Sequence, residues 1–311
     1  MTQGEKTVHL MGTVIRLWIE HAQPAEILLE AERRLIDYEK RFSANDESSE
    51  LNQIKHNAGI KPVKVDPELF YLIAVGKKHS LAKDSLLNVA IGPLIQTWRI
   101  GFNDAKQPTE TEIKALLKII DPQKIELNEA EQTVFLTEKG MALDLGSLAK
   151  GYFADELLAY FKSVDVSAAL IDLGGNILTY GPAPKHADHY WRIGIQNPFS
   201  KRGDYALVVK VKDQSLVTSG VYERAAEFNG KTYHHIFDSQ TGYPLETAVT
   251  SLTVISPKSL DGEIWTTRLF GKSPEEIIAT LNAYDLFGIV ITNDGEIVYS
   301  EALGPQLTFN Q

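Results

Sequence analysis

The stretch Asp144-Leu-Gly-Ser-Leu-Ala-Lys-Gly-Tyr152 joins an apolar segment, a glycine-serine turn and the start of a helix. We expect a strand at 141–145 and a helix at about 149–161. The start of such a helix presents free backbone N–H groups and the positive end of the helix dipole, which suits a phosphate group. Lys150 adds a full positive charge. The alternative is an ordinary strand-to-helix turn with a surface lysine.

The segments on either side of this stretch predict an α+β protein. A strand is expected at 7–19, interrupted at Gly12, where a bulge or a ligand approach would fit. Asp66 before a proline and the capping pattern Thr109-Glu-Thr-Glu112 mark two helix starts. A polar turn is expected at 43–49. The remaining expected strands are 124–127, 133–136, 168–172, 191–196, 205–211, 215–218, 250–255, 288–292 and 297–299, and the helices are 24–42, 67–83, 109–120, 262–269 and 274–284.

Composition excludes several classes of protein. The 311 residues, 43% of them hydrophobic, are enough for one large domain or two, and disorder is excluded as the main state. No run of about 18 uninterrupted apolar residues is present, so no transmembrane segment is expected. The net charge of −10 disfavours a nucleic-acid surface. The absence of cysteine excludes disulfides, thiolate metal sites and a cysteine nucleophile.

Two further clusters carry small and ionisable residues. In the first, Asp172-Leu-Gly-Gly-Asn-Ile177, the glycines could take positive φ angles or admit a ligand, and the alternative is a plain tight turn. The second runs from Val217 to Arg224 and on through Tyr233-His-His-Ile-Phe-Asp238. His235 could act there as a general base, and the alternative is a structural histidine. His234 and His235, as neighbours in a strand, would point to opposite faces and would not share a metal.

A third cluster, Asp261-Gly-Glu-Ile-Trp-Thr-Thr-Arg268, places Glu263 and Thr267 on one face of a helix, with Thr266 beside them. A carboxylate and hydroxyl groups are hard oxygen ligands that suit Mg²⁺. The alternative is a helix-capping pattern with a solvated glutamate.

Together, these motifs resemble the ApbE-type flavin transferases, which move FMN from FAD onto a protein hydroxyl. The resemblance covers nearly the whole chain in order. Its motifs are Met11-Gly-Thr13, Phe42-Ser43 followed by Ser49-Glu-Leu51, Asn57-Ala-Gly59, Ile91-Gly-Pro-Leu94 with Trp98, the stretch from Asp144 to Gly151, Leu173-Gly-Gly-Asn176, Trp191 with Gln196-Asn-Pro198, Thr218-Ser-Gly220, and His235-Ile-Phe-Asp238 with Thr241-Gly-Tyr-Pro244. The resemblance implies one ApbE-like domain over 1–311, or two closely packed subdomains without a clear linker. It also implies mixed, largely antiparallel sheets with flanking helices, related to the T-fold.

The resemblance also implies the site residues. The positions that would contact FAD are Met11, Asn45, Leu86, Leu87, Asn88, Asp144, Lys150, Thr218, Ser219 and Phe237. Those that would hold magnesium are Ser147, Glu263, Thr266 and Thr267. His235 lies close to the transfer site in the family, and either it or Asp144 would remove the proton from the attacking hydroxyl.

Four positions depart from the family pattern. Asn88 and Ala90 stand where aspartate and threonine are usual. Glu263 replaces the usual metal-binding aspartate, and Thr266 occupies a position that is a second aspartate in some members. One negative charge is thus missing at the metal site, which Asp261 would compensate after a shift in local register.

The activity implied is Mg²⁺-dependent transfer of FMN from FAD to a threonine or serine of an acceptor flavoprotein, with AMP released. Met11 and Leu87 are candidates for the apolar wall beside the isoalloxazine ring. The alternatives are a Mg²⁺-dependent FAD pyrophosphatase and a flavin-binding protein without catalysis. The N-terminus carries no signal core or lipid-attachment cysteine, so we expect a cytoplasmic protein, or an exported lipoprotein whose leader has been removed.

Overall fold

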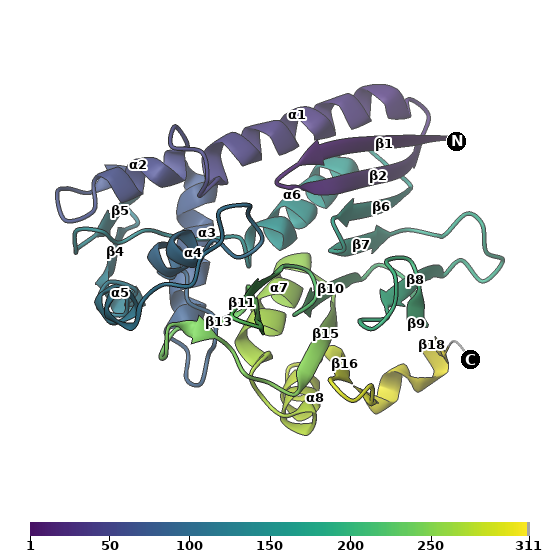
Figure 1. Cartoon of the computed structure of the whole chain (residues 1–311). Coiled ribbons are helices and arrows are strands. Elements are labelled where there is room, and N and C mark those ends of the chain that lie inside the picture. Colours follow the sequence, from purple (N-terminus) through teal and green to yellow (C-terminus); the bar gives the residue numbers. More distant parts are fainter. Residues whose placement is uncertain (310–311) are drawn as a thin grey trace.

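An eight-stranded antiparallel sheet forms the centre of the computed structural model, which describes residues 1–309 (Figure 1). Its strand order is β1-β2-β6-β7-β10-β15-β16-β17, so the hairpin at the N-terminus pairs with strands from the middle of the chain. The strands are β1 (Thr2–Leu10), β2 (Thr13–His21), β6 (Ala168–Leu173), β7 (Ile177–Tyr180), β10 (Ser215–Gly220), β15 (Val249–Ser256), β16 (Phe287–Thr292) and β17 (Ile297–Tyr299).

Alternating side chains cover both faces of this sheet, as the two-residue repeat of a strand requires. On β2, Ile15, Leu17 and Ile19 belong to the main core, whereas Trp18 packs into a second core on the opposite face. The main core is covered by α1 (Pro24–Phe42), α6 (Ala149–Ser163), α7 (Ser259–Leu269) and α8 (Pro274–Ala283). The second core lies against the three-stranded sheet β18-β9-β8, with β8 at Trp191–Gln196, β9 at Tyr205–Val211 and β18 at Leu307–Phe309.

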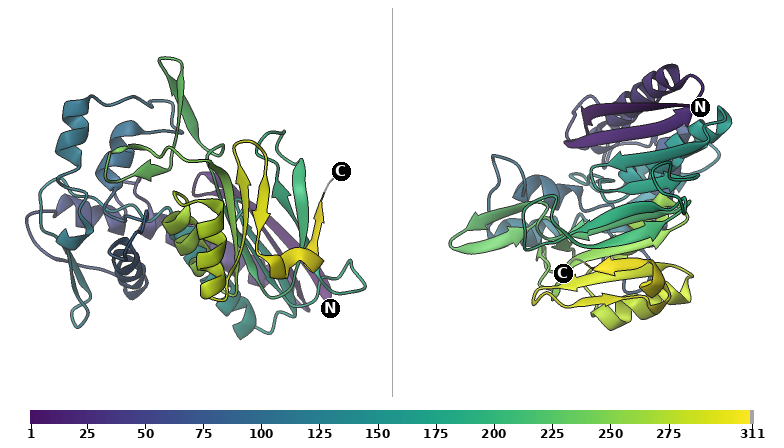
Figure 2. Two further views of the ribbon diagram at one scale, coloured as in Figure 1. Left: turned by 90° about the horizontal axis from the view of Figure 1, so that it is seen from below. Right: turned by 90° about the vertical axis from the view of Figure 1, so that its right-hand side faces the viewer.

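A third core is centred on Trp98 and joins short elements from distant parts of the chain. The Trp98 ring packs against Phe237 and Tyr233 at centroid distances of 5.9 and 5.4 Å, and its Nε1 donates to the carbonyl of Gly242 at 3.0 Å. These elements are α4 (Gly92–Trp98), α5 (Glu110–Leu116), β11 (Ala225–Phe228), β12 (Lys231–His234), β13 (Phe237–Asp238) and β14 (Tyr243–Pro244). Figure 2 shows the β11–β12 hairpin projecting from the body of the molecule in both views.

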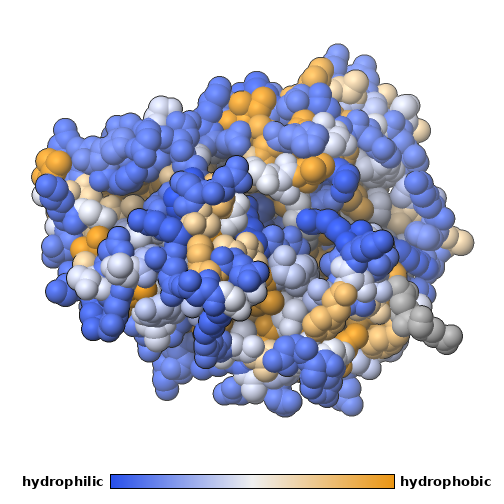
Figure 3. All heavy atoms as spheres, viewed as in Figure 1, coloured by the Kyte–Doolittle hydropathy of each residue, from blue (hydrophilic) through white to orange (hydrophobic). Residues whose placement is uncertain are grey.

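The remaining elements are α2 (Glu50–His56), α3 (Pro67–Ser80), the 3₁₀ turns η1 (Pro122–Lys124) and η2 (Glu301–Gln306), and the small sheet β3-β5-β4, with β3 at Val63–Lys64, β4 at Ile125–Asn128 and β5 at Thr133–Leu136. No helix within 1–309 is long and apolar enough to cross a membrane. The face seen in Figure 3 is mainly hydrophilic, with apolar side chains in small, separate patches.

The expected mixture of helices and largely antiparallel sheets is confirmed, but the single strand at 7–19 is wrong. The chain forms a hairpin there, with Met11 and Gly12 as the turn residues at φ angles of 55° and 69°. Gly12 therefore permits a turn with two positive φ angles and not a bulge within a strand. The run of apolar residues on both sides of the turn concealed it.

Other expectations differ locally. No strand forms at 141–145. The segment makes one backbone hydrogen bond to the neighbouring segment, from the Asp144 amide to the Val89 carbonyl at 2.9 Å, and one bond is not a strand ladder. The expected helices at 67–83 and 109–120 end earlier, at Ser80 and Leu116. The short helices α2 and α4 and the hairpin β11–β12 were not expected. The capping box at Thr109 and the helix after residue 149 are confirmed.

The contact between α6 and α7 positions the residues of the third sequence cluster. A Cβ atom on Gly151 of α6 would lie 2.6 Å from the carbonyl oxygen of Ser259 and 2.7 Å from Cγ of Glu263. Only glycine therefore permits this close approach. Asp155, one turn further along α6, accepts hydrogen bonds from the amides of Ser259 and Leu260 at 2.8 and 2.9 Å and so caps α7 from outside.

This cap predicts a pH effect on stability. Burial raises the pKa of Asp155 to about 6, well above the usual range of an aspartate, although the two amide hydrogen bonds favour a lower pKa. Because the folded-state pKa is the higher one, the contribution of Asp155 to stability is complete below about pH 4 and is lost as the pH rises to about 6. In Asp155→Asn, the free energy of unfolding measured in urea should not show this decrease between pH 4 and 6. An identical pH dependence of the two proteins between pH 4 and 7 would contradict the assignment.

Candidate active site

Lys150 and Glu263 form an ion pair where α6 and α7 meet. The distance from Lys150 Nζ to Glu263 Oε1 is 3.2 Å. The Glu263 residue is only 3% exposed, so the alternative of a solvated glutamate in a capping pattern is wrong. Lys150 remains about one-third exposed, with its side chain at 33%. The buried carboxylate of Glu263 is thus paired with a lysine whose side chain extends to the surface.

A series of hydrogen bonds between buried polar side chains holds Glu263 in place. Asn176 Nδ2 donates to Glu263 Oε1 at 2.9 Å, and Ser259 Oγ donates to Asn176 Oδ1 at 2.6 Å. Ser215 Oγ lies 2.9 Å from Ser259 Oγ. Asn176 is 1% exposed and follows Gly174 and Gly175, whose φ angles of 71° and 96° confirm the positive values expected there.

The start of α6 has the features of an anion site. Leu148 occupies the N-cap position, and its aliphatic side chain cannot accept a hydrogen bond from the first-turn amides. The Ala149 amide donates to the Leu145 carbonyl at 2.8 Å, but the amides of Lys150 and Gly151 and the positive end of the helix dipole remain available to a ligand. Ser147 and Asp144 precede them, and Asp144 Oδ1 accepts from the amide of Gly146 at 2.8 Å. Burial raises the pKa of Asp144, while that hydrogen bond and the charge of Arg224 oppose the shift.

His235 follows the last residue of β12 and is thus outside the strand in which it was expected. Its Nδ1 lies 3.3 Å from the carbonyl oxygen of Arg224. A carbonyl only accepts, so the hydrogen bond requires Nδ1–H and leaves Nε2 as a proton acceptor. Burial lowers the pKa of His235 to about 4, and the positive charges of Arg224, His234 and Lys150 lower it further, against the hydrogen bond to Arg224. The imidazole is therefore neutral near pH 7.

A divalent cation would find hard oxygen ligands here. Glu263 provides one carboxylate, Thr267 lies one helical turn later on α7, and Ser147 offers a hydroxyl and a carbonyl group. Thr266 contributes less, because its buried hydroxyl donates to the Glu263 carbonyl at 3.1 Å. Within 1–309, no group of three or more histidine, aspartate or glutamate residues could hold a metal. This donor set fits Mg²⁺, which keeps positions for water and for phosphate oxygens of a ligand.

The other residues implied for FAD come from separate segments of the chain. Asn88 makes two internal hydrogen bonds with its side-chain amide, donating to the carbonyl of Ile120 at 2.8 Å and accepting from the amide of Ala90 at 2.9 Å. Leu87 is 1% exposed and belongs to the main core, so in this conformation it offers no wall to a flavin ring. Asn45 is exposed, and its Oδ1 accepts from Gln96 Nε2 at 3.1 Å.

Four implied positions lie on strands or in a turn. The Met11 amide donates to Glu39 Oε1 at 2.6 Å in the β1–β2 turn, and the Met11 side chain packs against the main core. The Thr218 hydroxyl on β10 lies 2.8 Å from that of Thr253 on β15, with Ser219 next along the strand. Phe237 is buried beside Trp98.

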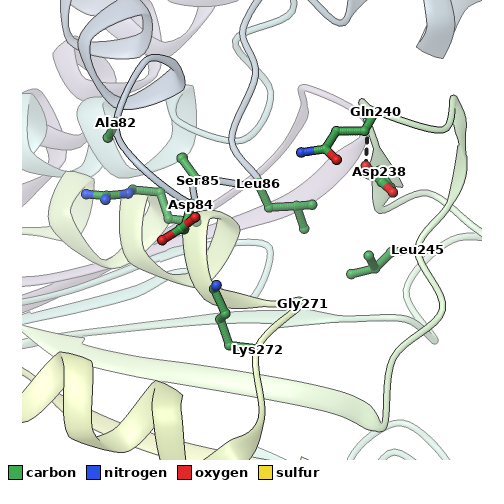
Figure 4. Close-up of a pocket in the computed structure, with 10 residues that line it drawn as sticks. Ala82, Asp84, Ser85, Leu86, Asp238, Gln240, Leu245, Gly271 and Lys272 are labelled. Atoms are coloured by element: carbon green, nitrogen blue, oxygen red, sulfur yellow. Dashed lines mark hydrogen bonds between the residues drawn. The ribbon is translucent and has the colours of Figure 1, made fainter.

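A pocket of about 430 Å³ includes Leu86 in its lining. Figure 4 shows the pocket between residues 82–86 with Lys272 on one side and residues 238–245 on the other. Arg268 also lines it, and its guanidinium lies 4.4 Å from the ring centroid of Trp265. The pocket therefore combines two apolar side chains, Leu86 and Leu245, with charges of both signs.

Arg224 and Asn176 lie within the sequence clusters, but no role was predicted for either of them. A Cβ atom on Gly12 would lie 3.9 Å from Arg224 Nη2, and one on Gly101 would lie 2.9 Å from Arg224 Cδ. The side chain of Arg224 thus passes Gly101, in the loop after α4, and its guanidinium approaches Gly12 in the N-terminal hairpin. The position of Asn176 directly after two glycines was the available signal for its burial, but its partners come from a distant helix.

Comparison with known proteins identifies the family. The sequence model of the ApbE family matches residues 11–289. The chain is 42% identical over 264 residues to an FAD:protein FMN transferase of Klebsiella pneumoniae, covering 85% of this chain and 81% of the relative. It is 35% identical over 290 residues to an FAD:protein FMN transferase of Treponema pallidum, covering 88% and 80%. The chain belongs to the ApbE family.

Solved structures agree with this assignment. The ApbE protein of Thermotoga maritima has a TM-score of 0.89 and 25% identity, covering 98% of this chain and 99% of that one. The flavin transferase ApbE of Vibrio cholerae has the same fold, with a TM-score of 0.82 at 22% identity over 98% and 99% of the two chains. The expected ApbE-like architecture is confirmed.

Proposed function

We propose that this chain is an FAD:protein FMN transferase that requires Mg²⁺ and modifies a threonine or serine of an acceptor flavoprotein. The observation that carries the proposal is the Lys150–Glu263 pair at the uncapped start of α6. It places a mobile cation, a buried carboxylate and free backbone amides at one point. This is the combination that binding and cleaving a diphosphate requires.

The residues of this site have separate roles in the proposed reaction. The amides of Lys150 and Gly151 and the Lys150 ammonium would bind the diphosphate of FAD, and Glu263, Thr267 and Ser147 would hold the cation. A divalent cation supplies Lewis-acid stabilisation of charge on the phosphoryl oxygens. The acceptor oxygen forms a bond to the FMN phosphorus, and the bond from that phosphorus to the bridging oxygen breaks, releasing AMP. The hydroxyl proton passes to Nε2 of His235.

The decisive experiment combines the protein with FAD, Mg²⁺ and a candidate flavoprotein acceptor. We expect the acceptor to gain the mass of one FMN group on a threonine or serine, located by peptide mass spectrometry. A parallel reaction without acceptor measures release of FMN and AMP. Hydrolysis there without any modification of acceptors would instead establish an FAD pyrophosphatase, and tight retention of FAD without turnover would establish a flavin-binding protein.

His235→Ala should retain FAD binding but lose transfer by about 10²–10⁴-fold, the usual contribution of a general base. His234→Ala is the matched control, because the hydrogen bonds of His234 are made with the backbone of Ile236 and Leu245. Isothermal titration with FAD and single-turnover transfer rates separate the two effects. Unchanged transfer in His235→Ala would remove this residue from the mechanism.

The pH profile provides an independent check. His235 accepts a proton only when neutral, and its pKa lies near 4. The transfer rate of the wild-type protein should therefore not fall as the pH decreases from 8 to about 5, although an ordinary histidine would be half protonated near pH 6.5. A rate that halves near pH 6.5 would contradict the neutral imidazole.

A further inference from the structure

The side chain of Asn176 is hydrogen-bonded to the carboxylate of Glu263, which the proposed function assigns to the cation. We infer that Asn176 is a positioning residue for the divalent cation, acting through Glu263; this inference rests on the proposed function. Asn176 Nδ2 donates to Glu263 Oε1, and Lys150 Nζ approaches the same oxygen. Neither contact uses Oε2. The carboxylate is thus held by one oxygen while the other is left to a ligand.

The orientation of the Asn176 amide is itself fixed. Ser259 Oγ donates to Oδ1 at 2.6 Å, so the NH₂ group must face Glu263. The amide of Leu173 also donates to the carbonyl of Asn176 at 2.9 Å, which anchors the backbone of the turn. If the side-chain amide flipped, Oδ1 would face a carboxylate and the Ser259 hydroxyl would lose its acceptor, an unfavourable exchange for buried groups.

Glu263 needs this support more than a shorter side chain would. Glutamate has one more rotatable bond than aspartate, and Mg²⁺ requires near-octahedral geometry. The Cγ atom of Glu263 packs over Gly151, at a point where any other residue would clash. Gly151 therefore positions the aliphatic part of the side chain, and Asn176 positions the carboxylate.

The test measures Mn²⁺ binding, by electron paramagnetic resonance of the free ion, in the presence of FAD and without acceptor. Outer-shell partners of metal ligands typically change affinity by 10–100-fold. We expect Asn176→Ala to weaken Mn²⁺ binding within this range. Ser259→Ala, which releases the amide to flip, is a milder second variant and should weaken binding by about 3–10-fold.

Ser215→Ala is the matched control, since it removes a buried hydroxyl from the far end of the same chain without touching Asn176 or Glu263. Thermal unfolding should show losses of stability in all three variants, whereas Mn²⁺ affinity should fall only in the first two. Wild-type-like affinity in folded Asn176→Ala and Ser259→Ala would overturn the positioning role alone. Absence of Mn²⁺ binding in the wild-type protein would overturn the metal requirement, and both proposals with it.

Discussion

Glu263→Gln should lose at least about 10²-fold in the rate of FMN transfer, because it removes the only charged ligand of the proposed cation site while keeping the shape of the side chain. The glutamine oxygen can still accept from Asn176 Nδ2, so the packing of α7 should persist. Lys150 is one-third exposed and can turn to water when its partner is neutral. We therefore expect a stability change of only about 1 kcal/mol.

The measurement is a Mg²⁺ titration of the transfer rate, with the free energy of unfolding measured in parallel. In Glu263→Gln, half-saturation should shift to higher Mg²⁺ concentration and the plateau should fall. Glu110→Gln is the control, because it makes the same chemical change at the exposed ion pair with Lys114 on α5. Transfer at the wild-type rate with an unchanged Mg²⁺ dependence would show that Glu263 does not hold the cation.

Gly151→Val should lower the free energy of unfolding by about 3 kcal/mol and also impair transfer. The new side chain would meet the backbone of Ser259 at 2.6 Å and Cγ of Glu263 at 2.7 Å, so α6 and α7 must separate. Overpacking of this kind typically costs about 1–3 kcal/mol, and here the obstacle is backbone, which cannot rotate away. The separation also moves Glu263 away from the start of α6.

Gly304→Val is the matched control, since a Cβ atom at residue 304 meets no atom within 4 Å. Chemical denaturation should show a much smaller change in this control. Transfer rates of Gly151→Val, measured at a temperature where the protein is folded, should still be reduced. Wild-type stability of Gly151→Val would mean that the two helices do not approach as closely as described.

Local sequence signals predicted individual elements well where the signal is self-contained. The capping box at Thr109 and the helix that starts at residue 149 need only their own residues. The β1–β2 hairpin was missed because Met11, a residue that seldom takes a positive φ angle, occupies its turn. The helices α2 and α4 have only seven residues each, too few for a clear periodic pattern.

The candidate site was predictable as a set of residue types but not as a geometry. The sequence clusters around Lys150 and Glu263 each indicated ligand chemistry separately. Their ion pair joins positions 113 residues apart (263 − 150), and no local pattern encodes such a contact. The same holds for Asn176 and Ser259, whose partners become evident only when β6, α6 and α7 have packed together. Family resemblance supplied the set of residues, and tertiary packing supplies their arrangement.

The pairing of β2 with β6 has a consequence for synthesis on the ribosome. β2 ends at His21, whereas its partner β6 begins at Ala168. At about 5–20 residues per second, the N-terminal hairpin waits roughly 7–30 s for that partner to emerge. During this interval Ile15, Leu17 and Ile19 lack their final neighbours. The nascent chain thus exposes an apolar strand with an open edge, a natural target for chaperones that bind before translation ends.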